Sequence, residues 1–445
     1  MKKINKISGF PEYSPYIRSI ELDYINKIKS SFALHGFTDI ETPAVELIET
    51  LSSKGEDVDK EIYSLSRLAD NSNNDSSGKF ALHYDLTVPL ARYVSQHFND
   101  LDFPFRRSQI QKVWRGERPQ EGRYREFLQC DIDIIGSENL SIDSDYQVIA
   151  AALDAMRKLN IGKVGLKLNS RKILEGAYGC IGVVNIDEVI RIMDKINKVS
   201  KAELQDMLIK HGLDSQIAEK CIKFAEISTS NGEILESLIS NVVASNNDLL
   251  NEGLQETINL MNRLQSKFGK YFDIQADMSI ARGFDYYTGM ICEGYFLDYP
   301  AYPSICAGGR YDNLVSNFSN KKLPGVGMSI GFTRIFTKML AENLLPQGSK
   351  NPAKVMIARY PETKFEDLEN LADLLRNENI STIVHYEDSK LTKQLRYASK
   401  IQIPYVILVS DSSDVIELKD MNTGAQEIIK VENLIQSLVG KNESR

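Results

Sequence analysis

Apolar residues recur at helical spacing near the start of the chain and again through a long central segment. The first pattern begins after Ser14, a residue type favoured as a helix N-cap, with Pro15 at the first helical position, and it stops at Gly36. From residue 186 to about residue 264 strand-like patterns disappear, and apolar residues recur every three or four positions. We therefore predict an N-terminal helix and a central helical insertion.

Residues 114–136 have a different pattern, which predicts two strand-like arms joined by a loop at residues 118–123. On the second arm, alternate positions form a polar face and an apolar face. The polar face carries Arg125, Phe127, Gln129, Asp131 and Asp133. The apolar face can pack on a core, whereas the polar face needs water, a partner strand or a ligand.

The remaining segments divide the chain further. Residues 37–43 and several segments between 281 and 331 are strand-like, and residues 345–352 have the composition of a linker. Beyond it, strand patterns at 354–358, 382–385 and 405–409 alternate with helical patterns at 365–377 and 391–399. This alternation predicts a small α/β domain around a mainly parallel sheet.

Composition narrows the class of protein. The 445 residues are 42% hydrophobic and 26% charged, as in soluble globular proteins of two or three domains, and we predict a cytoplasmic location because no membrane-spanning run or signal peptide is found. Five scattered cysteines and five dispersed histidines predict neither disulfides nor a metal site. The net charge of -8 means that any nucleic acid must be held by local patches.

The arginines of residues 114–136 are the strongest chemical signal. Arg115 and Glu117 lie two positions apart and point the same way. Guanidinium groups beside carboxylates on a sheet suit a substrate with phosphate at one end and an amine at the other. The alternative is a hairpin whose exposed face is laced by arginine–carboxylate pairs, and this segment alone does not decide between them.

Four other clusters carry chemical groups in a fixed order. Residues 83–89 place Asp85 and Thr87 two apart, and residues 281–287 read A-R-G-F-D-Y-Y. Residues 307–312 read A-G-G-R-Y-D, and residues 325–334 run from a strand of small residues to Arg334. Each cluster taken singly also fits a turn, core aromatics or a bend. Their joint order is more specific.

Together these segments resemble the histidyl-tRNA synthetases, a family of class II aminoacyl-tRNA synthetases, along almost the whole chain. Residues 37–43, 115–136 and 325–334 are similar to class motifs 1, 2 and 3, and R-G-F-D-Y-Y and A-G-G-R-Y-D to the two histidine-specific signatures. The resemblance implies an α+β catalytic core on an antiparallel sheet, a helical insertion, a C-terminal α/β anticodon-binding domain and a homodimer. The expected boundaries are 1–175 with 265–345 for the core, 176–264 for the insertion, 346–352 for the linker and 353–445 for the last domain.

The resemblance also implies a reaction in which the histidine carboxylate attacks the α-phosphorus of ATP, and histidine then passes to the end of its tRNA. Arg115 would contact the α-phosphate, Arg123 and Arg334 the outer phosphates, and Arg282 would bridge the substrate carboxylate and the α-phosphate. Glu117 would belong to the ATP site. Magnesium is expected on the phosphates. A carboxylate is already ionised at neutral pH, so no general base is needed.

The hydrogen-bonding groups of histidine match the remaining candidates. Acceptors for the α-ammonium would come from Asp85, Thr87 and Gln129, while Asp133 and the Tyr287 hydroxyl would match the imidazole. The set of histidine-binding residues is completed by Tyr311. Asp85 and Asp133 stand where many family members carry Glu, which leaves the carboxylate geometry there to be determined.

Transfer RNA has two candidate contact regions. The loop of motif 2, with Arg118 and Gln120, would meet the acceptor end. In the last domain, a predicted helix carries a basic stripe of Lys390, Lys393, Arg396 and Lys400, which could face phosphates or simply be the solvated side of the helix.

Two alternatives come from other functional classes. A non-catalytic relative, such as the regulatory subunit of ATP phosphoribosyltransferase, would lose the phosphate-handling arginines and the anticodon domain. A tRNA sensor built on such a module would carry an effector domain. The four arginines Arg115, Arg123, Arg282 and Arg334 are present, about a hundred residues follow motif 3, and we find no effector domain.

Overall fold

The computed structural model describes residues 5–52, 60–67, 79–243, 247–281, 287–313, 318, 320–409 and 415–443. Its internal contacts define two compact units. The first comprises Met1–Pro11 and Tyr24–Leu345, and the second comprises Glu12–Asp23 and Pro346–Arg445. The helix α1, Pro15–Leu34, begins where the sequence predicts, and the Ser14 hydroxyl accepts a hydrogen bond from the Ile17 amide (3.4 Å).

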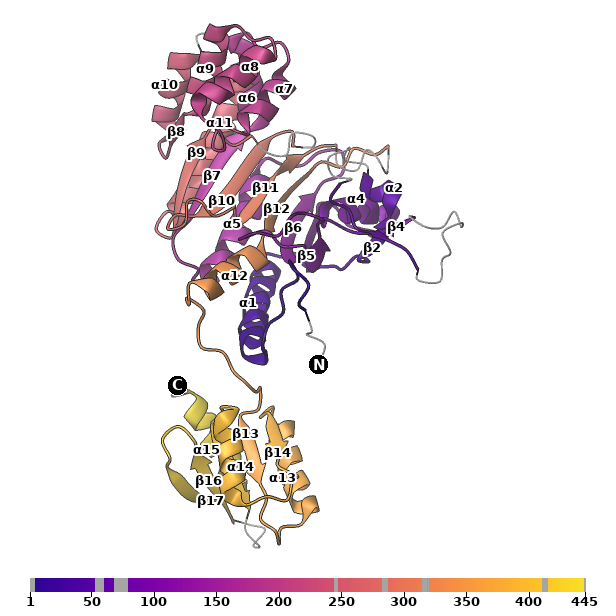
Figure 1. The fold of residues 1–445 in the computed structure, drawn as a ribbon, viewed down its shortest axis with the longest axis vertical. Coiled ribbons are helices and arrows are strands. Elements are labelled where there is room, and N and C mark those ends of the chain that lie inside the picture. The colour runs from indigo at the N-terminus through magenta and orange to yellow at the C-terminus, as the bar shows by residue number, and fades with distance from the viewer. Residues whose placement is uncertain are drawn as a thin grey trace. The chain divides into compact units, whose positions relative to one another are not determined.

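A nine-stranded sheet is the centre of the first unit (Figure 1). Its order is β1-β5-β6-β12-β11-β10-β7-β9-β8, and neighbours are antiparallel except in the pairs β1–β5 and β7–β9. The strands are β1 Thr38–Asp39, β5 Phe105–Trp114, β6 Glu126–Ile135, β7 Val164–Ser170, β8 Ser228–Thr229, β9 Phe272–Asp277, β10 Met290–Phe296, β11 Cys306–Tyr311 and β12 Gly325–Ile330. The predicted α+β core on a largely antiparallel sheet is confirmed.

Helices and a small second sheet flank this core. Helices α5 (Asp143–Lys158) and α12 (Phe332–Ala341) pack against it. Beside β5 lies a three-stranded sheet with two helices (Figure 1). Its elements are β2 Val45–Leu47, β3 Ser64–Leu65, β4 Phe80–Leu82, α2 Ile48–Leu51 and α4 Thr87–Gln96.

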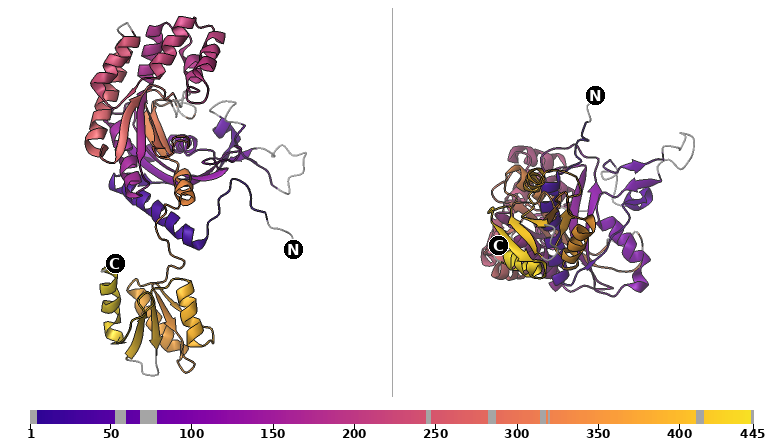
Figure 2. Two further views of the ribbon diagram at one scale, coloured as in Figure 1. Left: turned by 60° about the vertical axis from the view of Figure 1, so that its left-hand side comes forward. Right: turned by 90° about the horizontal axis from the view of Figure 1, so that it is seen from below.

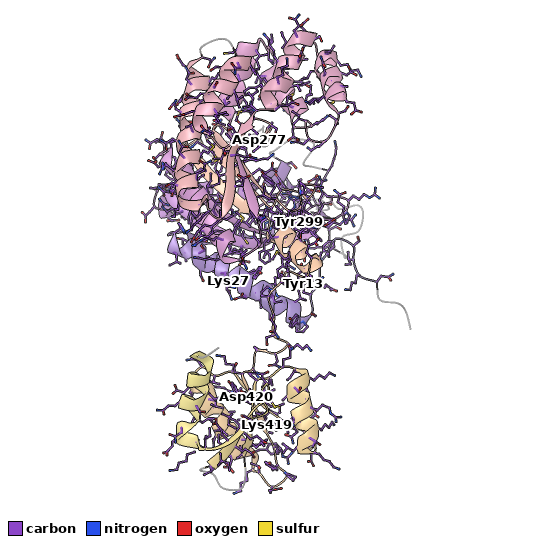
Figure 3. The ribbon with its side chains drawn as sticks, turned by 90° about the vertical axis from the view of Figure 1, so that its left-hand side faces the viewer. Tyr13, Lys27, Asp277, Tyr299, Lys419 and Asp420 are labelled. Atoms are coloured by element: carbon purple, nitrogen blue, oxygen red, sulfur yellow. The ribbon has the colours of Figure 1, made fainter. Side chains whose placement is uncertain are left out.

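The central helical segment lies at the β7–β9–β8 end of the large sheet (Figures 1 and 2). Its helices are α6 Arg171–Ile181, α7 Ile186–Met193, α8 Lys201–Lys210, α9 Ser215–Ala225, α10 Gly232–Val242 and α11 Asp248–Phe268. The expectation that this segment contains no strand is wrong, because the two residues of β8 lie between α9 and α10 and pair with β9. Asp277, labelled in Figure 3, is the last residue of β9. It pairs with Lys167 at 2.6 Å.

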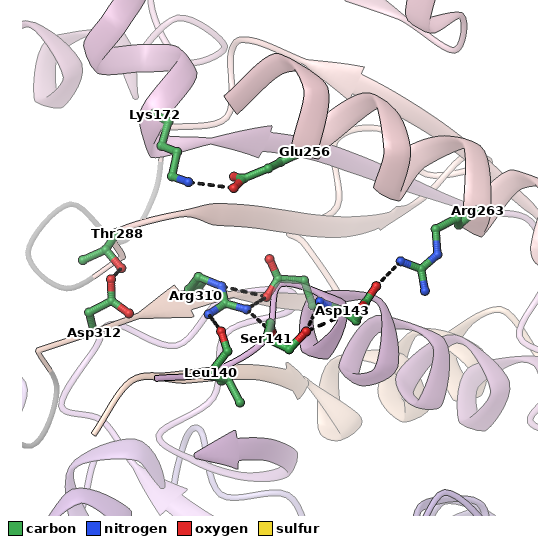
Figure 4. Close-up of polar contacts among 10 residues, drawn as sticks. Leu140, Ser141, Asp143, Lys172, Glu256, Arg263, Thr288, Arg310 and Asp312 are labelled. Atoms are coloured by element: carbon green, nitrogen blue, oxygen red, sulfur yellow. Dashed lines mark hydrogen bonds and ion pairs between the residues drawn. The ribbon is translucent and has the colours of Figure 1, made fainter. Parts of the chain in front are cut away.

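A buried ion pair fixes α5 to the sheet (Figure 4). Arg310 Nε donates to Asp145 Oδ1 (2.9 Å), and its other nitrogens donate to the carbonyls of Leu140 and Ser141. Burial raises the pKa of Asp145 to about 6, against the opposing effect of Arg310. The arginine of the A-G-G-R-Y-D segment is therefore structural, since it satisfies a carboxylate that would be costly to bury alone.

The second unit holds a five-stranded sheet of order β14-β13-β15-β16-β17. Its strands are β13 Val355–Ala358, β14 Thr382–Val384, β15 Tyr405–Val409, β16 Val415–Asp420 and β17 Gln426–Lys430, and its helices are α13 Phe365–Asn377, α14 Leu391–Lys400 and α15 Val431–Glu443. The first three strands are parallel as predicted, but β16 and β17 add antiparallel pairs, so the sheet is mixed. None of the described helices combines the length and apolarity needed to cross a bilayer.

Candidate active site

The register of the large sheet gathers polar side chains on one face. Arg107 of β5 lies opposite Asp133 of β6, and Gln109 lies opposite Asp131. On the other side of β6, Asp131 pairs with Ser329 of β12. Residues opposite one another in a sheet project from the same face. Side chains of three neighbouring strands therefore form one polar surface, which we call the polar floor and which consists of Arg107, Gln109, Asp131, Asp133 and Ser329.

Glycines on β11 and β12 make room above this floor. A Cβ atom at Gly327 would lie 1.9 Å from Asp133 Oδ1, and one at Gly325 would lie 2.3 Å from the ring of Tyr311. At Gly309 it would lie 2.6 Å from the ring of Tyr287. No side chain fits at such distances, so glycine at these positions lets the carboxylate and the two tyrosines share the face.

The result is a cavity of about 260 Å³ over the floor. Eight of the predicted site residues line it, namely Asp85, Thr87, Arg115, Gln129, Asp133, Tyr287, Tyr311 and Arg334. Asp85 is held in place because its Oδ1 accepts a hydrogen bond from the amide of Val88 (3.0 Å), in the first turn of α4. The alternative of a solvated, salt-bridged hairpin face is wrong, since Asp131 and Asp133 of β6 are each 4% exposed and line a cavity.

Asp133 is the most constrained carboxylate of the cavity. Tyr311 donates its hydroxyl to Asp133 Oδ1 at 2.7 Å, and Arg107 approaches Oδ2 at 2.7 Å. Burial raises the pKa of Asp133, while Arg107 and the Tyr311 hydroxyl oppose this shift. The side chain is therefore held on both oxygens in one orientation, which is the condition for selective recognition of a small polar ligand.

The neighbouring residues Asp131 and Gln129 each have one oxygen that accepts no hydrogen bond from the described residues. Asp131 Oδ1 and Gln129 Oε1 are buried and have no hydrogen-bond partner among the described residues. Burial raises the pKa of Asp131 to about 7, with Arg107 and the Ser329 hydroxyl opposing. Unpaired buried acceptors are uncommon in folded proteins, and here they lie where a ligand's donors would enter.

Sequence reasoning did not single out Arg107, Asp131 or Ser329 as site residues. Arg107 is fully buried and serves both carboxylates, at 2.7 Å from Asp133 and 3.9 Å from Asp131. Arg107, Gln109 and Gln111 share one face of β5, but Arg106, Ser108 and Lys112 make the other face polar as well, so the strand carries no clear alternation that would have found them. Only the strand register shows which carboxylates they meet.

A second cavity of about 490 Å³ adjoins the first, and the two share Arg115, Ser304 and Arg334. Its lining residues are Glu61, Arg115, Glu117, Arg123, Arg191, Asp194, Lys198, Pro303, Ser304 and Arg334. Its charged side chains are five cations and three carboxylates, an excess of two positive charges. An anion entering this cavity meets a favourable field.

The two shared arginines are held by backbone carbonyls. Arg115 Nε donates to the carbonyl of Tyr84 (3.1 Å), and its guanidinium lies over the ring of Phe127 at 5.2 Å. Arg334 donates to the carbonyls of Gly122 (2.7 Å) and Ser304 (2.8 Å). Both guanidinium groups are therefore oriented before any ligand binds.

The loop between β5 and β6 is arranged around the second cavity. Arg123 lies 3.6 Å from Glu117, and Arg115 lies 3.8 Å from the same carboxylate. Gln120 pairs with Arg123 through backbone hydrogen bonds, and Arg118 and Gln120 are exposed. Arg282 lies outside the described residues, so its predicted role stays a prediction.

The predicted basic stripe of the second unit is solvent-exposed. Lys393, Arg396 and Lys400 are exposed on α14, and Lys390 is exposed at its N-cap. The helix is anchored by Gln394, which is 1% exposed, accepts the Arg359 amide and donates to the Arg359 carbonyl. The stripe therefore has a fixed position beside the end of β13.

Aromatic side chains that the sequence analysis did not single out lie on this same side of the second unit. Tyr386 and Tyr397 are 53% and 45% exposed. The Tyr386 ring stacks on the Phe365 ring, with their centroids 6.2 Å apart. The Arg359 guanidinium lies over the Phe365 ring, 4.4 Å from its centroid. His385 packs edge-on to Tyr397 at 5.9 Å. We call Phe365, His385, Tyr386 and Tyr397, together with the basic stripe, the basic–aromatic face.

The sheet, its two cavities and the separate α/β unit define a class II aminoacyl-tRNA synthetase architecture. Residues 11–335 match the family model described as histidyl-tRNA synthetase, and residues 354–441 match the one described as anticodon binding domain. The chain belongs to the histidyl-tRNA synthetase family.

Individual relatives agree with the family assignment. The chain is 42% identical to the histidine–tRNA ligase of Thermobifida fusca, over 94% of this chain and 95% of the relative. It is 38% identical to that of Finegoldia magna, over 93% and 94%. A solved histidyl-tRNA synthetase from Nostoc sp. PCC 7120 superposes with a TM-score of 0.85 at 33% identity, covering 99% of this chain and all of that one.

Proposed function

We propose that the chain activates histidine with ATP and transfers it to the 3′ end of histidine tRNA. The observation that carries the proposal is the pair of adjoining cavities. One presents carboxylates and tyrosine hydroxyls suited to an amino acid, the other presents excess positive charge suited to phosphates, and Arg115 and Arg334 lie at their junction. Bond formation between a carboxylate and a phosphate has to take place at such a junction.

In the smaller cavity, histidine would be recognised from two sides. Asp85, Thr87 and Gln129 would accept the three hydrogens of its α-ammonium, and Asp131 would add a fourth acceptor. The imidazole would be matched by the carboxyl group of Asp133 and the phenol of Tyr287, with Tyr311 holding Asp133 in place. A ligand without the imidazole donor would leave Asp133 incompletely paired, which is how a site discriminates strongly.

At the junction, the histidine carboxylate would attack the α-phosphorus as an anion, so no residue has to remove a proton. Arg115 would neutralise charge on the α-phosphate, and Arg123 and Arg334 would hold the outer phosphates. Arg282 would bridge the two reacting groups, as the resemblance predicts. The contribution of these residues is placement of charge before the reaction, which needs no reorganisation during it.

Magnesium would enter with the phosphates of ATP and offset their charge. The described residues contain no cluster of three or more ligating side chains. The larger cavity nevertheless offers Glu61 and Glu117, whose oxygens are the ligand type that Mg²⁺ prefers. Burial and the charge of Glu117 raise the pKa of Glu61, and a cation near both would relieve that repulsion.

Transfer RNA would contact both units. Arg118 and Gln120, exposed beside the phosphate cavity, would meet the acceptor end. The basic–aromatic face suits single-stranded nucleotides, because bases stack on exposed rings while lysines and arginines meet phosphates. Arg359 Nε, His385 Nδ1 and Ser389 Oγ are buried there without a hydrogen-bond partner among the described residues. These atoms support a polar partner at this place.

A homodimer and a cytoplasmic location complete the proposal. Strand β1 lies at the edge of the large sheet and is two residues long, so a second copy could continue the layer there. Sedimentation velocity would test the dimer. The regulatory-subunit alternative is disfavoured by Arg115, Arg123 and Arg334, which all line the phosphate cavity.

Histidine-dependent exchange of pyrophosphate into ATP tests the proposal most directly. We expect exchange with histidine and none with the other amino acids, followed by charging of histidine tRNA. A chain that binds histidine calorimetrically but catalyses no exchange would support the regulatory alternative instead.

A further inference from the structure

The larger cavity has one wall that comes from the helical segment rather than from the sheet. Arg191 lies on α7, Asp194 caps that helix, and Lys198 follows one turn later. These positions are three and four residues apart, so they lie on one side of the chain. The opposite side carries buried Val189, Ile192 and other apolar residues of α7.

The wall adds positive charge to that of Arg115 and Arg123, which lie between β5 and β6, and of Arg334 on α12. Lys198 Nζ lies 2.7 Å from Asp194 Oδ2, so this lysine is already oriented by a neighbouring carboxylate. Without Arg191 and Lys198 the cavity would contain three cations, Arg115, Arg123 and Arg334, against its three carboxylates. Because Asp194 belongs to the helical segment as well, that segment supplies one of the two excess positive charges. Arg115, Arg123 and Arg334 against Glu61 and Glu117 supply the other.

We propose that Arg191 and Lys198 bind the outer phosphates of ATP and the pyrophosphate formed from them, which makes the helical segment part of the activation site. This inference rests on the proposed function. The α-phosphate must lie at the junction marked by Arg115 and Arg334, and the chain of phosphates then extends into the larger cavity. The β- and γ-phosphates need more positive charge than Arg115, Arg123 and Arg334 supply, because Glu61 and Glu117 offset two of these three charges.

The inference has a consequence for the catalytic cycle. Phosphate bound by cations of both walls favours the arrangement in which the helical segment lies close to Arg115, Arg123 and Arg334. The position of the helical segment therefore depends on whether phosphate is bound. Pyrophosphate release would then loosen the wall before tRNA is charged.

Replacing Arg191 and Lys198 with alanine, singly and together, tests the inference. In exchange assays without tRNA, we expect the KM values for ATP and pyrophosphate to rise about fivefold for each single variant and about twentyfold for the double variant, with the KM for histidine unchanged. Arg191→Lys should restore part of the loss. The control is Lys195→Ala, an exposed lysine of the same turn that does not line the cavity.

A second readout does not depend on catalysis. Calorimetric titration with inorganic pyrophosphate should show weaker binding for the double variant than for wild type and for Lys195→Ala. Unchanged KM values and unchanged pyrophosphate affinity would overturn the inference. A rise confined to the KM for tRNA would also overturn it, by assigning these cations to the acceptor end. Absence of exchange in the wild-type chain would instead reject the proposed function.

Discussion

The polar floor of the first unit and the basic–aromatic face of the second, which we propose as binding surfaces, hold their charged groups in opposite ways. Arg107, Asp131 and Asp133 are at most 4% exposed, and each is tied to a partner across the sheet. Tyr386 and Tyr397 are about half exposed, and the lysines beside them project into solvent. The same residue chemistry therefore operates in two different dielectric environments.

The difference teaches how burial matches the size of a ligand. A small amino acid offers few contacts, so each must be strong, and groups held out of water give strong, directional interactions. A polynucleotide offers many phosphates and bases, so exposed contacts that are individually weak and sensitive to salt are sufficient. Deleting a group of the buried floor should thus cost more than deleting one of the exposed face.

The largest effect is expected for Arg115→Ala at the junction of the cavities. Loss of a fixed cation at the α-phosphate should lower the rate of histidine-dependent pyrophosphate exchange about 100- to 1,000-fold. Lys112→Ala, which removes a more exposed cation from β5, the strand that ends just before Arg115, is the control and should retain exchange. A loss below tenfold would mean that Arg115 does not contact the transition state.

Asp133→Asn should act on the amino acid rather than the nucleotide. The change keeps the shape but removes the charge that pairs with the imidazole, so the KM for histidine should rise about 10- to 100-fold while that for ATP changes less than threefold. Asp143→Asn, an exposed carboxylate paired with Arg263, is the matched control. Equal increases for both substrates would contradict the assignment.

Asp131→Asn tests how much the burial of an ionisable carboxyl group in the polar floor lowers the free energy of unfolding. Because the folded-state pKa of Asp131 is raised to about 7 from an ordinary value near 3.8, the unfolded chain loses this proton first, and the contribution of the residue to stability falls as pH rises from about 4 to 7. The asparagine variant lacks this loss. Relative to wild type, it should therefore gain about 1–3 kcal/mol in the free energy of unfolding between pH 4 and pH 8.

Urea unfolding followed by the fluorescence of Trp114 measures this gain, because Trp114 is the chain's single tryptophan and lies on β5 beside the floor. A difference between variant and wild type that is the same at both pH values would show that Asp131 does not titrate in this range.

The smallest effect is expected on the exposed face. Tyr386→Ala removes one stacking surface and should raise the KM for tRNA roughly fivefold, about 1 kcal/mol, without changing pyrophosphate exchange. Ile428→Ala, which trims another exposed apolar side chain of the second unit, should leave both unchanged. An unaltered KM for tRNA in Tyr386→Ala would place the contact elsewhere.

Residue patterns within short segments of the sequence predicted several features of the fold and of the site. Alternation along β6 predicted which residues share a face, and the register of β6 confirms that Asp131 and Asp133 lie on the same side of the sheet. In the second unit, the helical periodicity matched α13 to the residue and α14 to within one residue. These features depend on neighbours within a few positions of the chain, so a single sequence contains them.

The sequence by itself thus determined the family, the motifs and eight of the residues that line the smaller cavity. Only the tertiary structure decided that Arg107 pairs with Asp133, that Phe365 and Tyr386 stack, and that Arg191 and Lys198 form a wall of the larger cavity. The physical reason is that strand register and helix packing join residues far apart in the chain. Such contacts are fixed by burial across the whole fold and leave no periodic trace in the segments they join.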